Sequence, residues 1–80
     1  MSIKYKVNDR ILLTDADYNF EFIIGQECTI ISMGKKKIHI RIDIYSDDLH
    51  NCYHRCDNGH GYYAKLSQIK LIKGNWLNRI

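Results

Sequence analysis

Residues 37–45 read Lys-Ile-His-Ile-Arg-Ile-Asp-Ile-Tyr, with an isoleucine at every second position from 38 to 44. Apolar residues at a period of two line one face of a β-strand, whereas a helix would spread them around its whole circumference. The other face carries His39, Arg41 and Asp43 and is expected to face solvent. The segment therefore predicts a half-buried strand over residues 37–45, at the centre of an all-β fold.

Shorter strand patterns flank this segment on both sides. Residues 27–33 form a second strand pattern, and a glycine with three lysines then supplies a solvated hairpin turn. β-Branched and aromatic runs predict three further strands, over residues 10–14, 61–65 and 70–72. Asp and Asn mark two long loops, over residues 15–25 and 45–61, and residues 66–69 are expected to form one tight turn.

Composition limits the chain to one small domain. Its 80 residues are 45% hydrophobic and 26% charged, and thirteen isoleucines supply the apolar surface for a core. We expect a domain over residues 1–72 and a short tail over residues 73–80. No apolar run approaches the roughly 20 residues of a membrane-spanning helix. The first residues lack the apolar segment of a signal peptide, so a cytoplasmic protein is expected.

Three segments resemble the SH3-like barrel superfamily. They are Val-Asn-Asp-Arg-Ile-Leu-Leu at 7–13, Gly-Gln-Glu-Cys-Thr-Ile at 25–30, and Gly-Tyr-Tyr-Ala-Lys-Leu at 61–66 followed by Ile69, Leu71 and Ile72. The resemblance covers residues 5–72 and implies a small five-stranded SH3-like barrel with two long loops and a short C-terminal tail. Residues 58–63, Asn-Gly-His-Gly-Tyr-Tyr, also resemble a segment common in small uncharacterised phage and prophage proteins of this shape. A fold of this kind says little about function.

Aromatic residues are the main candidates for a binding surface. The two loops and the tail hold more of them than one small core accommodates, and tyrosine and tryptophan are favoured anchors at interfaces. The candidate partner-binding residues are Tyr18, Phe20, Tyr45, Tyr53, Tyr62, Tyr63 and Trp76. The alternative for some of these aromatic residues is that Phe20, Phe22 and one of the two tyrosines at 62 and 63 close the ends of the barrel. They predict a non-enzymatic module, a monomer or small homo-oligomer, that docks on another protein. The phage resemblance implies a host protein, such as a defence or transcription enzyme, that docking inhibits.

Nucleic acid is the alternative partner. The candidate residues are Lys35, Lys36, Lys37 and Arg41, with the tyrosines as surfaces on which bases stack. The resemblance adds that KOW-type barrels bind RNA. The formal net charge is only +3, and the candidate basic residues and tyrosines are interleaved with aspartates at 43, 47, 48 and 57. The lysines also suit a merely solubilising turn.

The second loop also holds the residues that could bind a metal. They are His50, Cys52, His54, Cys56 and His60, and thiolate and imidazole are the natural ligands of zinc. The alternative is that the two cysteines are a small apolar residue and a free thiol, in a loop without metal. Cys28 is expected in the core, and three cysteines without a secretory signal do not suggest a disulfide framework. No partner residues for a catalytic cysteine are evident, so an enzyme is not expected.

Overall fold

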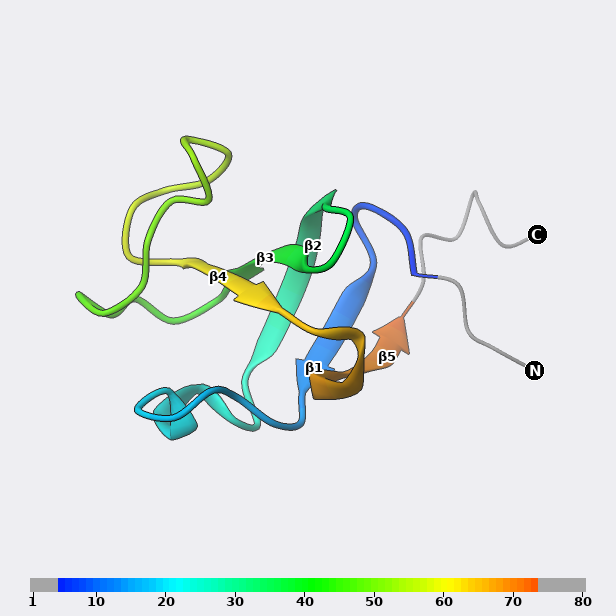
Figure 1. Cartoon of the computed structure of the whole chain (residues 1–80), viewed down its shortest axis with the longest axis horizontal. Coiled ribbons are helices and arrows are strands. Elements are labelled where there is room, and N and C mark those ends of the chain that lie inside the picture. The colour runs from blue at the N-terminus through cyan, green and yellow to red at the C-terminus, as the bar shows by residue number, and fades with distance from the viewer. Residues whose placement is uncertain (1–4, 74–80) are drawn as a thin grey trace.

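The computed structural model describes residues 5–73, which form one antiparallel sheet of five strands (Figure 1). The strands are β1 (Arg10–Leu13), β2 (Glu27–Met33), β3 (Ile38–Ile42), β4 (Gly61–Ala64) and β5 (Ile69–Lys73). Their order is β4-β3-β2-β1-β5, and the sheet is not closed between β4 and β5. Two 3-10 helices, η1 (Glu21–Ile23) and η2 (Leu66–Gln68), lie before β2 and before β5. The all-β prediction and the five predicted strand segments are confirmed.

The isoleucine stripe of β3 forms the centre of the core. Ile38, Ile40 and Ile42 are buried, and Ile40 lies opposite Ile30 in the β2–β3 pair. Each such side chain stabilises the fold by roughly 1.5–3 kcal/mol relative to an exposed one. The other buried residues of this core are Ile11, Leu13, Ile23, Cys28, Leu49, Tyr62, Ala64 and Ile69. The prediction that Cys28 is a core residue is confirmed.

β3 is shorter than predicted, because it ends at Ile42 rather than at Tyr45. Asp43 still donates its backbone N–H to the Glu27 carbonyl oxygen at 3.3 Å, and its carboxylate accepts hydrogen bonds from Arg10. Ile44 is exposed instead of extending the stripe. Pairing of β3 with β4 also stops at Arg41. The alternation of isoleucines therefore extends to Ile44, two residues beyond the end of β3.

Smaller differences lie at the turns and at the end of the sheet. The first long loop contains η1, which no sequence pattern indicated, and the predicted turn at residues 66–69 begins with η2. β5 runs to Lys73 and so includes the first residue of the predicted tail. Trp76 lies outside the described residues. Within residues 5–73, no helix is long and apolar enough to cross a membrane.

The two long loops extend toward the same end of the molecule. In Figure 1 the chain between β1 and β2 and the chain between β3 and β4 both reach to the left, whereas β5 lies to the right of β1. The view has the longest axis horizontal, and the molecule measures 38 Å along it and 23 Å and 22 Å across. The sheet thus places both loops at one end of the long axis.

Candidate functional site

The first loop, residues 14–26, is held to the body of the domain by specific contacts. The backbone N–H of Asp17 donates to the Tyr62 hydroxyl at 2.9 Å, and Gln68 Nε2 donates to the Asp17 carboxylate at 3.1 Å. The Phe20 ring packs on the Tyr62 ring, with 5.3 Å between centroids. The hydrogen bond from Gln68 lowers the pKa of Asp17, so this carboxylate stays charged. The loop therefore has a defined conformation.

This anchored loop presents apolar side chains to solvent. Tyr18 is 84% exposed, and Phe22 and Ile24 are also exposed, although Ile23 between them is fully buried. The carboxylates of the loop make no ion pair with any described Lys or Arg side chain; they belong to Asp15, Asp17 and Glu21. Exposed aromatic and aliphatic side chains that lie together are typical of binding surfaces.

The structure divides the predicted partner-binding residues into exposed and buried groups. Like Tyr18, Tyr53 and Tyr45 are exposed, at 77% and 62%. Phe20 is half-buried against the core. Tyr62 is only 4% exposed, so the prediction that it lies on a binding surface is wrong. Its ring lies on the core face of β4, and its hydroxyl accepts a hydrogen bond from the first loop.

A cluster of four rings lies where β3 and β4 meet the second loop, residues 43–60. The Tyr63 ring centroid lies 4.6 Å from that of His39, 4.5 Å from that of His50 and 6.2 Å from that of Tyr53. His39 is opposite Tyr63 in the β3–β4 pair, and His50 is bridged to the start of β4. We refer to these four residues as the ring cluster. The prediction that His39 faces solvent is wrong, because Tyr63 packs against its ring.

Tyr53 reaches the ring cluster from a left-handed turn. Residues 52–54 have φ angles of 50°, 57° and 67°. The carbonyl oxygen of Asn51 accepts hydrogen bonds from the N–H groups of Arg55 at 2.9 Å and Cys56 at 3.1 Å, which close the turn. Left-handed backbone costs roughly 1–2 kcal/mol per L-residue. Such a turn persists only where its surroundings hold it, and here Cys52 at its start is fully buried.

Both histidines of the ring cluster are held neutral. Burial lowers the pKa of His39 and of His50, and the charge of Arg55 lowers that of His39 further. The backbone N–H of Cys52 donates to His50 Nδ1 at 2.9 Å, so this nitrogen carries no proton. His39 Nδ1 is buried and has no hydrogen-bond partner among residues 5–73. The cluster is therefore a neutral aromatic surface near pH 7.

Two glycines allow the second loop to fold back on β4. Gly59 has a φ of 90°, and a Cβ atom there would come within 2.2 Å of the Tyr45 ring. A Cβ atom at Gly61 would come within 2.7 Å of the His50 carbonyl oxygen. These close approaches give a physical reason for the Asn-Gly-His-Gly sequence at residues 58–61.

The candidate zinc ligands of the second loop do not converge. Cys52 is buried in the core, and burial raises the pKa of its thiol to about 12. The Cys56 thiol contacts that of Cys52, and its pKa is raised by burial. His60 Nδ1 lies 2.7 Å from a backbone oxygen of β3, and His54 Nδ1 lies 3.2 Å from a neighbouring asparagine amide. In the described part of the chain, no three His, Cys, Asp or Glu side chains are placed to hold a metal ion.

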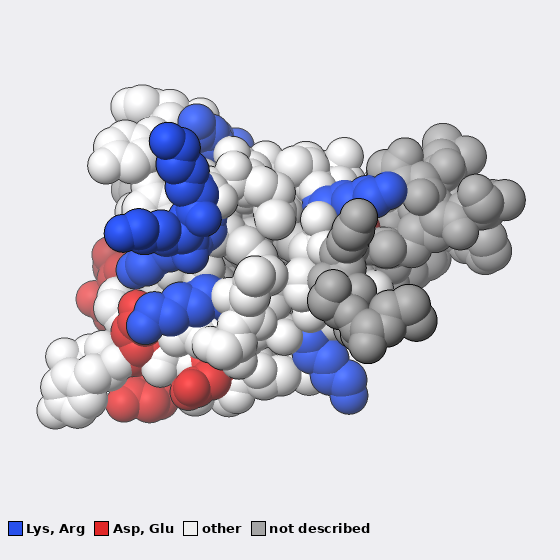
Figure 2. Space-filling model, turned by 45° about the vertical axis from the view of Figure 1, so that its right-hand side comes forward, with Lys and Arg blue, Asp and Glu red and all other residues white. Residues whose placement is uncertain are grey.

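The lysine turn, residues 34–37, joins β2 to β3 and is exposed. Gly34 lies beside His39, since a Cβ atom at position 34 would be 3.2 Å from His39 Nε2, so the turn adjoins the ring cluster. Arg41, the fourth candidate for nucleic-acid binding, lies 3.9 Å from the Asp57 carboxylate. Figure 2 shows Lys and Arg side chains gathered on one part of the surface, with acidic side chains below them.

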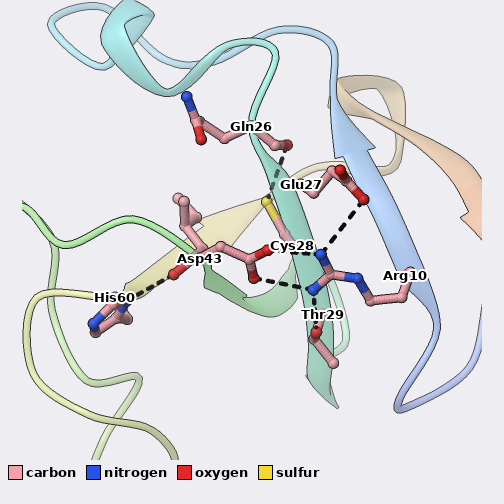
Figure 3. A network of polar contacts seen from close by, with 8 residues as sticks. Arg10, Gln26, Glu27, Cys28, Thr29, Asp43 and His60 are labelled. Atoms are coloured by element: carbon pink, nitrogen blue, oxygen red, sulfur yellow. Dashed lines mark hydrogen bonds and ion pairs between the residues drawn. The ribbon is translucent and has the colours of Figure 1, made fainter.

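A charged network at the base of the second loop was missed from the sequence. Arg10 of β1 donates two hydrogen bonds to the Asp43 carboxylate, at 3.0 and 2.7 Å, and one to Thr29 Oγ1 at 2.8 Å (Figure 3). Its Nη2 also lies 3.5 Å from Glu27. The hydrogen bond from Arg10 lowers the pKa of Asp43, and the same bond raises that of Arg10. Pairing the predicted strands would have placed Arg10 beside Thr29. No nearby residue in the sequence indicated that Asp43 also binds Arg10.

Comparison of the chain with family models, with curated proteins and with solved structures gives no match.

Proposed function

We propose that this chain is a non-enzymatic module that docks on a partner protein through its two long loops. The observation that carries the proposal is the exposure of three tyrosines on these loops, Tyr18, Tyr45 and Tyr53. Tyrosine combines a large apolar area with a polar tip and is enriched among the residues that dominate binding energy. Because both loops extend to one end of the molecule, a single partner surface can contact both (Figure 1).

The first loop is the better preorganised part of this surface. Its contacts with Tyr62 and Gln68 hold Asp17, which precedes Tyr18, and the Phe20 ring that follows it packs on Tyr62, so little loop entropy is lost on binding. Its carboxylates have no Lys or Arg partner within the described residues. A partner surface that carries Lys or Arg would complement this charge and speed association.

The cysteines favour a binding role over catalysis. Burial raises the pKa of Cys28 and of Cys52 to about 12, so both thiols are protonated at neutral pH. A catalytic cysteine needs the opposite, a thiolate stabilised by a nearby positive charge or helix N-terminus.

We infer that the five strands form a partly open SH3-like barrel, because β1 pairs with both β2 and β5 and η2 joins β4 directly to β5. The resemblance of residues 58–63 to phage and prophage proteins supports a narrower form of the function. In that form, the chain acts in the cytoplasm as a monomer or small homo-oligomer and inhibits a host protein by covering its surface.

Capture from a bacterial lysate tests the docking function. Three tagged proteins are compared: the wild type, a loop variant with Tyr18, Tyr45 and Tyr53 changed to Ala, and a matched variant with Lys35, Lys36 and Lys37 changed to Ala. We expect one protein to survive a high-salt wash on the wild type and on the lysine variant, and to be lost from the tyrosine variant. Equal retention by the tyrosine variant, or no retained protein on the wild type, contradicts the proposal.

Nucleic-acid binding is a second candidate function, favoured by the position of the lysine turn beside the ring cluster. Here Lys35, Lys36 and Lys37 would contact phosphates, whereas Arg41 contributes less because it pairs with Asp57. In the same capture, nucleic acid that elutes as salt rises, and that the lysine variant does not retain, supports this candidate.

A further inference from the structure

Tyr53 is the outermost ring of the ring cluster. It is highly exposed, whereas Tyr63 behind it is half-buried, and the planes of the two rings are inclined by only 24°. The rings of His39 and His50 pack against Tyr63 in turn. One face of Tyr53 therefore lies toward the cluster and the other lies toward solvent.

Arg55 and the lysine turn both adjoin the ring cluster. Arg55 is exposed two residues after Tyr53, and its Nη1 donates to the Cys52 carbonyl oxygen at 3.4 Å. Its charge acts on both His39 and Tyr63, which places it beside the ring cluster. The lysine turn adjoins the cluster on the side of His39. An aromatic surface with neighbouring Lys and Arg side chains suits a negatively charged chain that carries planar rings.

The backbone that carries Tyr53 is strained. Residues 52–54 are left-handed, and the carbonyl oxygen of Asn51 closes the turn by accepting two hydrogen bonds. Strained backbone of this kind is concentrated at ligand-binding positions, where it fixes a side chain before the ligand binds. Here its effect is to hold the Tyr53 ring nearly parallel to Tyr63 and exposed.

We propose that the outer face of Tyr53 is a stacking site for an unpaired base of single-stranded nucleic acid, with Arg55 and the lysine turn contacting the phosphates. This inference rests on the second candidate function and names the form of nucleic acid that it binds. A single strand is specified because bases in a duplex are already stacked and cannot cover the ring. Stacking is tolerant of sequence, since every base has a flat face.

Fluorescence anisotropy with labelled oligonucleotides tests this site. The probes are U-only RNA and T-only DNA strands of about 12 nucleotides, and a duplex of the same length. The variants are Tyr53→Ala, Tyr53→Phe, Tyr18→Ala as an equally exposed control, and the lysine variant with residues 35–37 changed to Ala. Titrations at about 50 mM and about 200 mM salt measure the phosphate contribution. Circular dichroism of each variant confirms that it is folded.

We expect Tyr53→Ala to weaken single-strand binding about tenfold or more, because base–aromatic stacking contributes on that scale. Tyr53→Phe keeps the ring and retains wild-type affinity, and Tyr18→Ala does the same. The lysine variant shows a flatter salt dependence. Tighter binding of one of the two strands shows whether RNA or DNA is preferred.

Three results overturn the inference in distinguishable ways. Salt-sensitive binding that depends on the lysine turn but is unchanged by Tyr53→Ala, or equally strong for the duplex, removes the stacking site and leaves the second candidate function standing. Absence of binding to all three probes removes both. Equal losses from Tyr53→Ala and Tyr18→Ala also overturn the inference, since stacking at one ring cannot depend on the other loop.

Discussion

Gly61 lies in contact with Cys52: a Cβ atom at position 61 would come within 2.9 Å of both the backbone nitrogen and Sγ of Cys52. The same glycine exchanges two backbone hydrogen bonds with His50, at 3.0 and 2.6 Å. The second loop therefore rests on β4 at a point where only a glycine leaves room for it. The left-handed turn begins at Cys52, and His50 is one of the four residues of the ring cluster. Both features therefore depend on the contact of these two residues with Gly61.

Gly61→Ala should destabilise the domain by about 2 kcal/mol, the usual scale of overpacking in a close-packed region. The added methyl group meets backbone atoms that cannot rotate away. Urea unfolding followed by circular dichroism measures the loss. Ser67→Ala, an exposed substitution in η2, serves as control and should change the free energy of unfolding by less than about 0.5 kcal/mol. If the two variants are equally stable, the packing of the loop on β4 is not as described.

Tyr62→Phe should loosen the first loop while leaving its ring packing intact. The substitution removes the hydroxyl that accepts the Asp17 N–H at 2.9 Å, at an expected cost of about 1–2 kcal/mol. Hydrogen exchange by NMR should show faster exchange at Asp17. Tyr63→Phe is the matched control, because the Tyr63 hydroxyl makes no hydrogen bond among residues 5–73. Unchanged exchange at Asp17 in Tyr62→Phe would argue against the anchoring role.

Stability should fall as the pH drops below the ordinary histidine pKa of 6.5. Burial lowers the pKa of His39 and of His50 in the folded state, so the unfolded chain binds protons first. The stabilising contribution is present above pH 6.5 and is lost as the pH falls through the lowered pKa values. NMR titration of the imidazole signals checks this directly, with the urea-unfolded chain as reference. Folded-state titration of both histidines at or above 6.5 would refute it.

Asp43→Asn should make the domain less sensitive to acid. Its hydrogen bonds with Arg10 lower the pKa of the Asp43 carboxylate, so the pair stabilises the fold above the ordinary value of 3.8 and loses its effect as the pH falls through the lowered pKa. At neutral pH the loss should be only about 0.5–1 kcal/mol, because the pair is partly exposed. Asp48→Asn provides the comparison, because Asp48 is exposed and makes no ion pair with the residues that the structure describes. Parallel acid profiles for wild type and Asp43→Asn would exclude the network as a source of acid sensitivity.

Only one of the three thiols should react quickly with Ellman's reagent in the folded protein. Cys28 and Cys52 are fully buried, and burial raises the pKa of each to about 12. Cys56 is only half-buried, so it is the thiol that the reagent reaches at about pH 8. Cys56→Ser should abolish the fast phase, and all three thiols should react in urea. A fast phase of two thiols would mean that the second loop opens readily.

The strands could be predicted because their signals are local. Alternating isoleucines, the Gly-Lys turn and the β-branched runs each lie within a few residues of one another, and the structure has a strand at each apolar run and a turn at residues 34–37. The length of β3 could not be predicted in the same way. The strand ends at Ile42, and the next residue, Asp43, accepts hydrogen bonds from Arg10, which is 33 residues earlier in the chain. Only the completed sheet brings these two side chains together.

The binding surfaces were less predictable than the strands. Tyr62 and Tyr63 are adjacent, so one must face the core and the other must face away, and the sequence does not say which. The pairing of Tyr62 with Ile40 places Tyr62 on the core side. The ring cluster combines residues from two strands and a loop, and its outermost ring depends on a left-handed turn that contains no glycine. No pattern of residue types indicates such a turn.

The open sheet has a consequence for self-association. The unpaired backbone N–H and C=O groups of an edge strand can form hydrogen bonds with a strand of another molecule. Proteins prevent this by covering the edge strand or by placing charged side chains on it. At the β4 edge, His50 already pairs with Gly61 and occupies the start of the strand. At the β5 edge, Lys70 is exposed within the strand. These two features oppose the addition of a foreign strand, at the start of β4 by occupying the backbone groups of Gly61 and at β5 by placing a charge within the strand.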